Sequence, residues 1–166
     1  MLVVALGLLA APPAGASSGP AGSRGLVKSG PVFLDGGCGA KSVVARVTIA
    51  TLEFAAAQPV TLHATVRNVS ASQCAVVGRA GGPTTAMGPC NSLSLKVLNS
   101  RGVNIWPGSV PYMCPLLLQL SFTAGAQFRA VGTWNQESAS GRRVPAGRYR
   151  VVVGNTLSFA ITIRPS

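Results

Sequence analysis

The fold of this chain is decided by residues 116–159, which read LLLQLSFTAGAQFRAVGTWNQESASGRRVPAGRYRVVVGNTLSF. Apolar and polar residues alternate here, as they do along a β-strand whose successive side chains point to opposite faces. Turn residues separate the alternating runs, and Gly154-Asn155 is a two-residue hairpin signal. The stretch therefore predicts several short antiparallel strands.

The same alternation extends back through the chain, with a turn roughly every ten residues. Its phase slips once, between Ile49 and Leu52, which predicts a β-bulge. No stretch after the N-terminus shows a helical period. We expect an all-β fold, an Ig-like antiparallel β-sandwich of seven to nine strands. The residues expected to face its core are Val43, Ala45, Val47, Ile49, Leu52, Phe54, Val60, Leu62, Ala64, Val66, Leu93, Leu95, Val97, Leu116, Leu118, Leu120, Phe122, Phe128, Ala130, Gly132, Trp134, Tyr149, Val151, Val153, Leu157, Phe159, Ile161 and Ile163.

The first 41 residues divide into an apolar leader and a segment of low complexity. Residues 1–16 hold an apolar run that ends in Ala14-Gly15-Ala16, the small-residue pattern of a signal-peptidase site, although no Lys or Arg precedes the run. A short buried strand or helix is the alternative for this run. Residues 17–41 are rich in Gly, Ser, Pro and Ala, which predicts a flexible linker in which Val32-Phe33-Leu34 could add an edge strand. The folded domain is then expected over residues 42–166, without a transmembrane segment, in a secreted or cell-envelope protein.

Four cysteines, Cys38, Cys74, Cys90 and Cys114, favour two disulfides in an exported chain. Cys38 and Cys74 are equidistant from position 56, inside a turn between two expected strands, and Cys90 and Cys114 are equidistant from Gly102. Antiparallel pairing would bring such residues opposite each other, which favours 38–74 with 90–114. The main alternative is 74–90 with 38–114.

The net charge is +11, from 14 basic and 3 acidic residues. Few aromatic residues lie among the basic ones as stacking platforms, so the composition disfavours nucleic acid as the partner. An anionic polymer or lipid of the envelope suits the charge, and so does a solvated basic surface that has no single partner and keeps the protein soluble. Arg142, Arg143, Arg148 and Arg150 are the only closely spaced group and form the candidate basic patch.

Catalysis is not expected, and neither is a cofactor or a metal site. The acids Asp35, Glu53 and Glu137 and the single His63 supply little for acid–base chemistry, and the alternation places His63 on an outward strand face. The cysteines lack metal-binding spacing. Asn68-Val69-Ser70 fits a glycosylation sequon, but its position between strands favours a turn.

Two irregular segments, residues 78–89 and 107–115, are the candidate contact loops, because loops longer than tight turns often carry binding functions. Their candidate contact residues, with the neighbouring Trp106, are Arg79, Thr84, Met87, Trp106, Tyr112 and Met113.

Four sequence pieces resemble the bacterial intracellular proteinase inhibitor domain of the BsuPI type. They occur in order between about residues 58 and 153: Asn68-Val69-Ser70, residues 95–102 leading to Ile105-Trp106, residues 120–125 before Trp134-Asn135, and residues 141–149 with Val144-Pro145-Ala146-Gly147-Arg148-Tyr149. The resemblance implies an Ig-like β-sandwich and, from the family's namesake, inhibition of a serine protease. Predicted export and four cysteines set this chain apart from the family.

Two functions are therefore expected. The first is a secreted, non-catalytic protein-binding module of proteinase-inhibitor type, with a protein partner such as a serine protease. The alternative is a structural or adhesive envelope protein that binds anionic polymers or lipids through a basic face.

Overall fold

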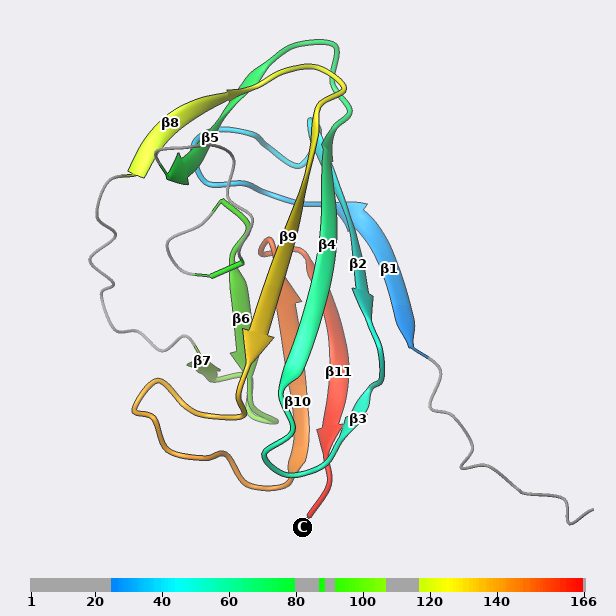
Figure 1. The fold of residues 1–166 in the computed structure, drawn as a ribbon, viewed down its shortest axis with the longest axis vertical. Coiled ribbons are helices and arrows are strands. Elements are labelled where there is room, and N and C mark those ends of the chain that lie inside the picture. The colour runs from blue at the N-terminus through cyan, green and yellow to red at the C-terminus, as the bar shows by residue number, and fades with distance from the viewer. Residues whose placement is uncertain (1–24, 80–86, 89–91, 107–116, 166) are drawn as a thin grey trace, which may run out of the picture.

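The computed structural model describes residues 25–79, 87–88, 92–106 and 117–165, and these residues form an all-β structure (Figure 1). The all-β prediction is thus confirmed, and within these ranges the chain forms no helix. The strands are β1 (Leu26–Pro31), β2 (Val43–Ile49), β3 (Glu53–Phe54), β4 (Val60–Asn68), β5 (Cys74–Arg79), β6 (Leu95–Leu98), β7 (Asn104–Trp106), β8 (Leu117–Phe122), β9 (Gln127–Trp134), β10 (Gly147–Val153) and β11 (Leu157–Ile163).

One sheet has the order β1-β2-β4-β9, and all its neighbouring strands are antiparallel. We call it the front sheet, because it lies toward the viewer in Figure 1. Buried residues alternate with partly or fully exposed ones along β2, β4 and β9, as the sequence predicts. This alternation gives the sheet one face in the core and one face toward solvent.

The second sheet, here the back sheet, has the order β3-β11-β10-β6-β7. Its central strands β6, β10 and β11 show the same alternation, with the predicted apolar residues buried. The inward faces of the two sheets contribute to one hydrophobic cluster. At one point of contact the rings of Trp134 from β9 and Tyr149 from β10 meet edge to face, with 5.5 Å between their centroids.

Position 132 of β9 faces the core, and a steric reason explains why it is occupied by glycine. A Cβ atom at this position would lie 2.6 Å from Cδ2 of Leu95 in the back sheet and 3.0 Å from Cβ of Met87. The absence of a side chain on β9 thus lets Leu95 approach the front sheet closely.

Strands β5 and β8 form a separate antiparallel pair at the top of the view in Figure 1. Phe122 at the end of β8 packs on Phe128 of β9, with 5.4 Å between ring centroids. The prediction that Leu118 faces the core is wrong, because 47% of this residue is exposed. The alternation along β8 is present, but neither main sheet covers the outer part of this pair. Leu116 lies outside the described residues.

The phase slip after Ile49 is real, but its predicted cause, a bulge within one sheet, is wrong. The chain leaves the front sheet after β2, and β3 pairs in parallel with β11 of the back sheet. The backbone N–H of Thr162 donates to the carbonyl of Leu52 at 2.8 Å, and that of Arg164 donates to Phe54 at 2.8 Å. Phe54 therefore reaches the same core as Ile49 from the opposite sheet.

The flexible linker predicted over residues 17–41 is contradicted from residue 25 onward. β1 pairs along its whole length with β2, and Val32 and Leu34 are buried in the core. The predicted strand at residues 32–34 is instead the connection that follows β1. Residues 1–24, including the predicted leader, lie outside the described part of the chain.

The described residues form eleven strands, more than the seven to nine expected. β1 falls within the predicted linker, while β3 and β7 have only two and three residues, too few to show a period of their own. The β10–β11 connection also differs: Val153 pairs with Leu157, so three residues form the turn rather than two. Gly154 and Asn155 both have positive φ, 59° and 63°, in keeping with their turn-forming types.

Candidate functional site

The disulfide predicted between Cys38 and Cys74 is present, with 5.2 Å between the Cα atoms. The pairing of β2 with β4 ends at Val43 opposite Asn68, so the chain segments beyond it bring the two cysteines together. This bond excludes the alternative pairing of 38–114 with 74–90. Cys90 and Cys114 lie outside the described residues, so their pairing stays a prediction.

Asn68, the first residue of the sequon, is a buried structural residue with no exposed surface. Its side-chain Nδ2 donates to the carbonyls of Ser72 at 3.0 Å and Phe122 at 2.8 Å. Its Oδ1 accepts hydrogen bonds from the backbone N–H and the hydroxyl of Ser70. The predicted turn at residues 68–70 is confirmed, and the amide joins it to the end of β8.

Gln136 plays a matching role at the opposite end of the sheets and was missed in the sequence. It is 2% exposed. Its Nε2 donates to the carbonyls of Ala55 at 2.8 Å and Gln58 at 2.6 Å, and its Oε1 accepts from the N–H of Ala57 at 2.8 Å. No local pattern signals this role, because the three partners lie in a turn about eighty residues earlier.

The candidate contact residues fall into three groups. Thr84, Tyr112 and Met113 lie outside the described residues. Arg79 ends β5 and Trp106 ends β7, where Trp106 is half-buried against the core. Met87 differs from the prediction: it is 6% exposed, so its side chain faces the core rather than a partner, and its N–H donates to the carbonyl of Val131 at 3.0 Å.

The four arginines of the candidate basic patch divide between two places. Arg142 and Arg143 lie in the loop between β9 and β10, where Arg143 forms a backbone bridge with Glu137. Arg148 and Arg150 lie on β10 and are exposed on the outward face of the back sheet. The four residues thus do not all lie on one sheet face.

A second group of arginines was not singled out in the sequence. Arg46, Arg67 and Arg129 are exposed on the outward face of the front sheet, and we call them the arginine face. Arg46 and Arg129 flank Thr65, since both are its partners in the strand register. The Cα atoms of these two arginines are therefore about 10 Å apart, two strand spacings. None of the four strands of this sheet contains Asp or Glu.

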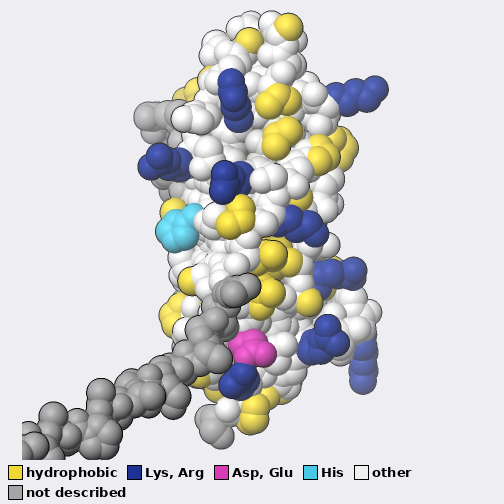
Figure 2. Space-filling view, turned by 90° about the vertical axis from the view of Figure 1, so that its right-hand side faces the viewer, with side chains coloured by type: hydrophobic (Ala, Val, Ile, Leu, Met, Phe, Trp, Pro, Cys, Tyr) yellow, Lys and Arg dark blue, Asp and Glu magenta, His cyan; other side chains and the backbone are white. Residues whose placement is uncertain are grey.

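Basic side chains are also widespread in the side view of the molecule (Figure 2). They are distributed along the length of the structure toward both margins of the view, whereas acidic colour is confined to one small area low in the view. The salt bridge between Glu53 and Arg164 accounts for one of the three acids of the chain.

The outward face of the back sheet contains a hollow of about 470 Å³, which we call the basic hollow. Its lining residues come from four strands and the β10–β11 turn: Lys96, Leu98, Asn104, Arg150, Val152, Asn155, Thr156 and Ser158. Two of the eight are cations and none is an acid. The hollow thus combines positive charge with neutral hydrogen-bonding groups.

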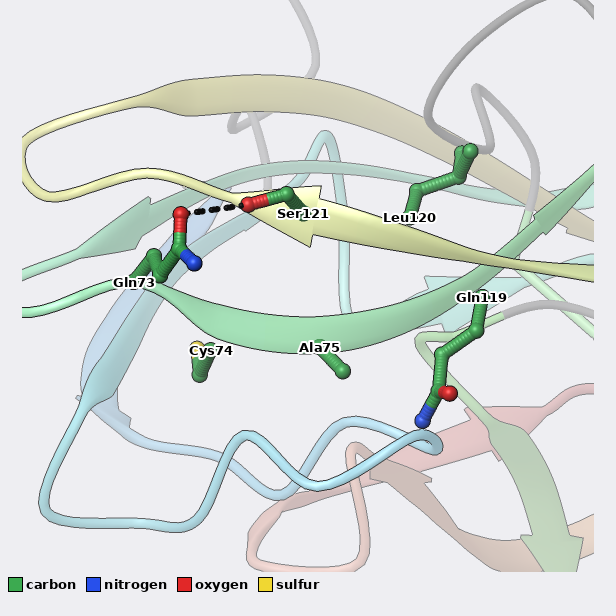
Figure 3. Close-up of a pocket in the computed structure, with 6 residues that line it drawn as sticks. All are labelled: Gln73, Cys74, Ala75, Gln119, Leu120 and Ser121. Carbon is green, nitrogen blue, oxygen red and sulfur yellow. Dashed lines mark hydrogen bonds between the residues drawn. The ribbon is translucent and has the colours of Figure 1, made fainter.

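A smaller hollow of about 310 Å³ lies on the β5–β8 pair, as Figure 3 shows. We call it the β5–β8 hollow. It is lined by Gln73, Cys74, Ala75, Gln119, Leu120 and Ser121. Its lining is uncharged, and several of its polar groups are already bonded. The hydroxyl of Ser121 donates to Gln73 Oε1 at 2.9 Å, and Gln119 Nε2 donates to the carbonyl of Gly36 at 3.2 Å. These bonds leave fewer groups for a ligand than the basic hollow offers.

The groups that could support acid–base chemistry lie apart from one another. His63 is exposed on β4, where its register partners are Thr48 and Val131. Partial burial raises the pKa of Asp35, and the nearby Lys96 ammonium offsets part of that rise. Over the ranges that the structure describes, no three His, Cys, Asp or Glu residues cluster as a metal site would require.

The described residues also contain no helix of the length and apolarity that a membrane span requires.

Comparison with known proteins gives no family assignment. No family model and no curated protein matches the chain. Among solved structures, a β-glucosidase from Listeria innocua in complex with gluconolactone is similar with a TM-score of 0.41 and 12% identity over 72% of this chain. The alkylpurine DNA glycosylase AlkC of Pseudomonas fluorescens gives 0.39 and 13% over 83%, and a β-D-glucoside glucohydrolase of Trichoderma reesei gives 0.35 and 19% over 86%. The chain spans 16%, 30% and 18% of the lengths of these three proteins.

Proposed function

We propose that this protein is an exported, non-catalytic binding module, built as an Ig-like β-sandwich, whose ligands are anionic polymers of the cell envelope. One observation carries the proposal: both main sheets have exposed cations on their outward faces with few acids to neutralise them. The arginine face lies on a sheet whose strands contain no acid. Arg148 and Arg150 are exposed on the other sheet, and Glu53 on the same sheet is engaged with Arg164.

The physical argument is electrostatic. Like charges fixed on a rigid sheet repel one another, and an anionic chain lying across them would remove that repulsion while releasing counter-ions. A net charge of +11 would also raise the rate of encounter with such a polymer at low salt.

The Ig-like part of the proposal is supported by the closing motif of the domain. The hydroxyl of Tyr149 donates to the carbonyl of Pro145, four residues upstream, at 2.6 Å. A tyrosine that bonds back to the backbone a few residues earlier is a recurrent feature of Ig-type sandwiches. Trp134, which packs on Tyr149, is fully buried and so belongs to the core rather than to a ligand platform.

The test is binding of the full chain to immobilised poly(glycerol phosphate) and polygalacturonate, with neutral dextran as the control. We expect binding to both anionic polymers, and a fall in affinity of about tenfold or more when the salt concentration rises from about 0.05 M to 0.5 M. The variant R46Q/R67Q/R129Q, whose changes are all at exposed positions, should bind the polymers more weakly. Equal binding to dextran, or affinity that does not change with salt, would contradict the proposal.

Inhibition of a serine protease is the second candidate. Its support is the pairing of Arg79 with Leu117. This pairing places the start of the first candidate contact loop next to the strand that follows the second. A titration against a panel of extracellular serine proteases tests this function. Stoichiometric loss of protease activity would support it, and full activity at excess protein would exclude it for those enzymes.

A further inference from the structure

The basic hollow has the features of a site for one defined ligand group rather than of a charged surface alone. The register places Val152 between Lys96 on β6 and Ser158 on β11. Val152 and Leu98 are half-buried and form an apolar floor, and the polar residues surround it. The volume of about 470 Å³ lies within the roughly 300–1,000 Å³ that is typical of small-molecule sites.

The two cations of the hollow are available to an anion in different ways. Nζ of Lys96 donates to Oδ1 of Asn155 at 2.7 Å, which fixes the ammonium at the rim while leaving it two further donors. Arg150 is exposed, and none of the described residues forms a hydrogen bond or ion pair with its guanidinium. A planar guanidinium presents donors in a fork that suits a carboxylate or a phosphate.

The remaining polar groups suit hydroxyls rather than a base or an aromatic ring. Asn104, Ser158 and Thr156 contribute short neutral side chains. The Thr156 hydroxyl donates to the carbonyl of Pro31, so toward a ligand it acts as an acceptor. The lining holds no aromatic residue on which a nucleobase could stack.

We propose that the basic hollow binds an acidic sugar unit, a pyranose that carries a carboxylate or a phosphate. Arg150 and Lys96 hold the anionic group, the neutral side chains bond the ring hydroxyls, and the Val152–Leu98 floor contacts the apolar face of the ring. The inference rests on the proposed binding of anionic polymers and names the unit of the polymer that is recognised.

The test is titration of the full chain with four probes by isothermal calorimetry and by amide chemical shifts: glucuronic acid, glucose 6-phosphate, glucose and inorganic phosphate. We expect the two acidic sugars to bind more tightly than glucose or phosphate, with shifts at residues 96–98 and 150–158. Comparison of the two acidic sugars shows whether a carboxylate or a phosphate is preferred.

Variants on one strand separate the hollow from the general charge. R150Q removes a cation of the hollow, whereas R148Q removes an identical charge two residues away on the same outward face, outside the lining. We expect R150Q and K96Q to weaken acidic-sugar binding by about tenfold or more, and R148Q by less than about twofold. D35N should strengthen binding, because it removes a negative charge that acts on Lys96.

The outcomes distinguish this inference from the proposed function. Equal losses in R148Q and R150Q would overturn the hollow as a site. Polymer binding that depends on salt, with no binding of either acidic sugar, would also overturn the hollow and leave the proposed function standing. R46Q/R67Q/R129Q should keep acidic-sugar affinity while losing polymer affinity, because its three changes lie on the front sheet.

Discussion

The two ends of the molecule are both organised around a buried amide side chain, and among the residues that the structure describes only one end also has a disulfide. At the Asn68 end, the amide joins the turn after β4 to the carbonyl of Phe122, and the Cys38–Cys74 disulfide lies beside it. Nδ2 of Asn68 is 3.8 Å from Sγ of Cys74. At the Gln136 end, the hydrogen bonds of the Gln136 amide hold the turn at residues 55–58 against the loop after β9.

The two ends differ in how much apolar burial stabilises the elements that lie there. The β5–β8 pair extends beyond the two main sheets, and its outer residues, such as Leu118, remain exposed. Among the described residues of this pair, only Val76 and Phe122 are buried apolar side chains, and the disulfide and the Asn68 amide add to the stability that this packing gives. The Gln136 end lies directly against Trp134 and Tyr149, which are almost fully buried. Large aromatic burial stabilises this end.

Removal of the disulfide is expected to have the largest effect on stability. C38S/C74S opens a link between residues 36 positions apart, which should lower the free energy of unfolding by about 3–4 kcal/mol. Denaturant unfolding of the variant and the wild type measures this loss. Hydrogen exchange should rise most in β5 and β8 and least at residues 55–58. An equal loss of hydrogen-exchange protection at both ends would show that the disulfide stabilises the whole domain rather than the β5–β8 end.

The two amides allow the comparison to be made residue by residue. N68A removes a buried hydrogen bond to the Phe122 carbonyl, and Q136A removes three partly buried hydrogen bonds to residues 55–58, so each should cost about 1–3 kcal/mol. The loss of Asn68 should increase exchange around residues 69–73, and the loss of Gln136 should increase it at residues 55–58. N99A is the matched control: Asn99 also bonds backbone N–H groups, but in an exposed turn where water can replace it.

A double-mutant cycle sharpens this result. N68A and C38S/C74S share a contact, so their effects should be non-additive, whereas Q136A should add to C38S/C74S within about 0.5 kcal/mol. Coupling of Q136A to the disulfide would mean that the two ends do not act independently.

Tyr149 gives the smallest expected effect and a pH dependence. Y149F removes the bond to the Pro145 carbonyl and should cost about 1 kcal/mol at neutral pH. Burial raises the pKa of Tyr149 above its ordinary value of 10.0, so the fold favours the neutral phenol. This contribution is complete below pH 10 and is lost as the pH rises through the folded-state pKa. The wild type should therefore lose stability above pH 10 more steeply than Y149F, and parallel curves would contradict the assignment.

Local pattern in the sequence predicted most of the strands and one disulfide, because alternation and hairpin symmetry are properties of neighbouring residues. Prediction from local pattern failed where a residue's structure depends on residues that are distant in the sequence. β1 has few apolar residues and forms a strand because the backbone of β2 is available beside it. The exposure of Leu118 depends on what covers β8, which alternation does not report. The basic hollow requires the pairing of β6 with β10, more than fifty residues later, so Lys96 and Arg150 could not be recognised as neighbours.

The outer strands of the two sheets have a consequence for how the protein behaves when it is concentrated. β1 carries Lys28 and ends in Pro31, which has no N–H to offer a second chain. On the opposite edge of the same sheet, the carbonyl of Val131 in β9 accepts the N–H of Met87. The edges of the back sheet, β3 and β7, are two and three residues long. The edges of the two main sheets therefore give a neighbouring copy little to pair with, which disfavours at these sheets the strand-to-strand addition that begins amyloid-type aggregation.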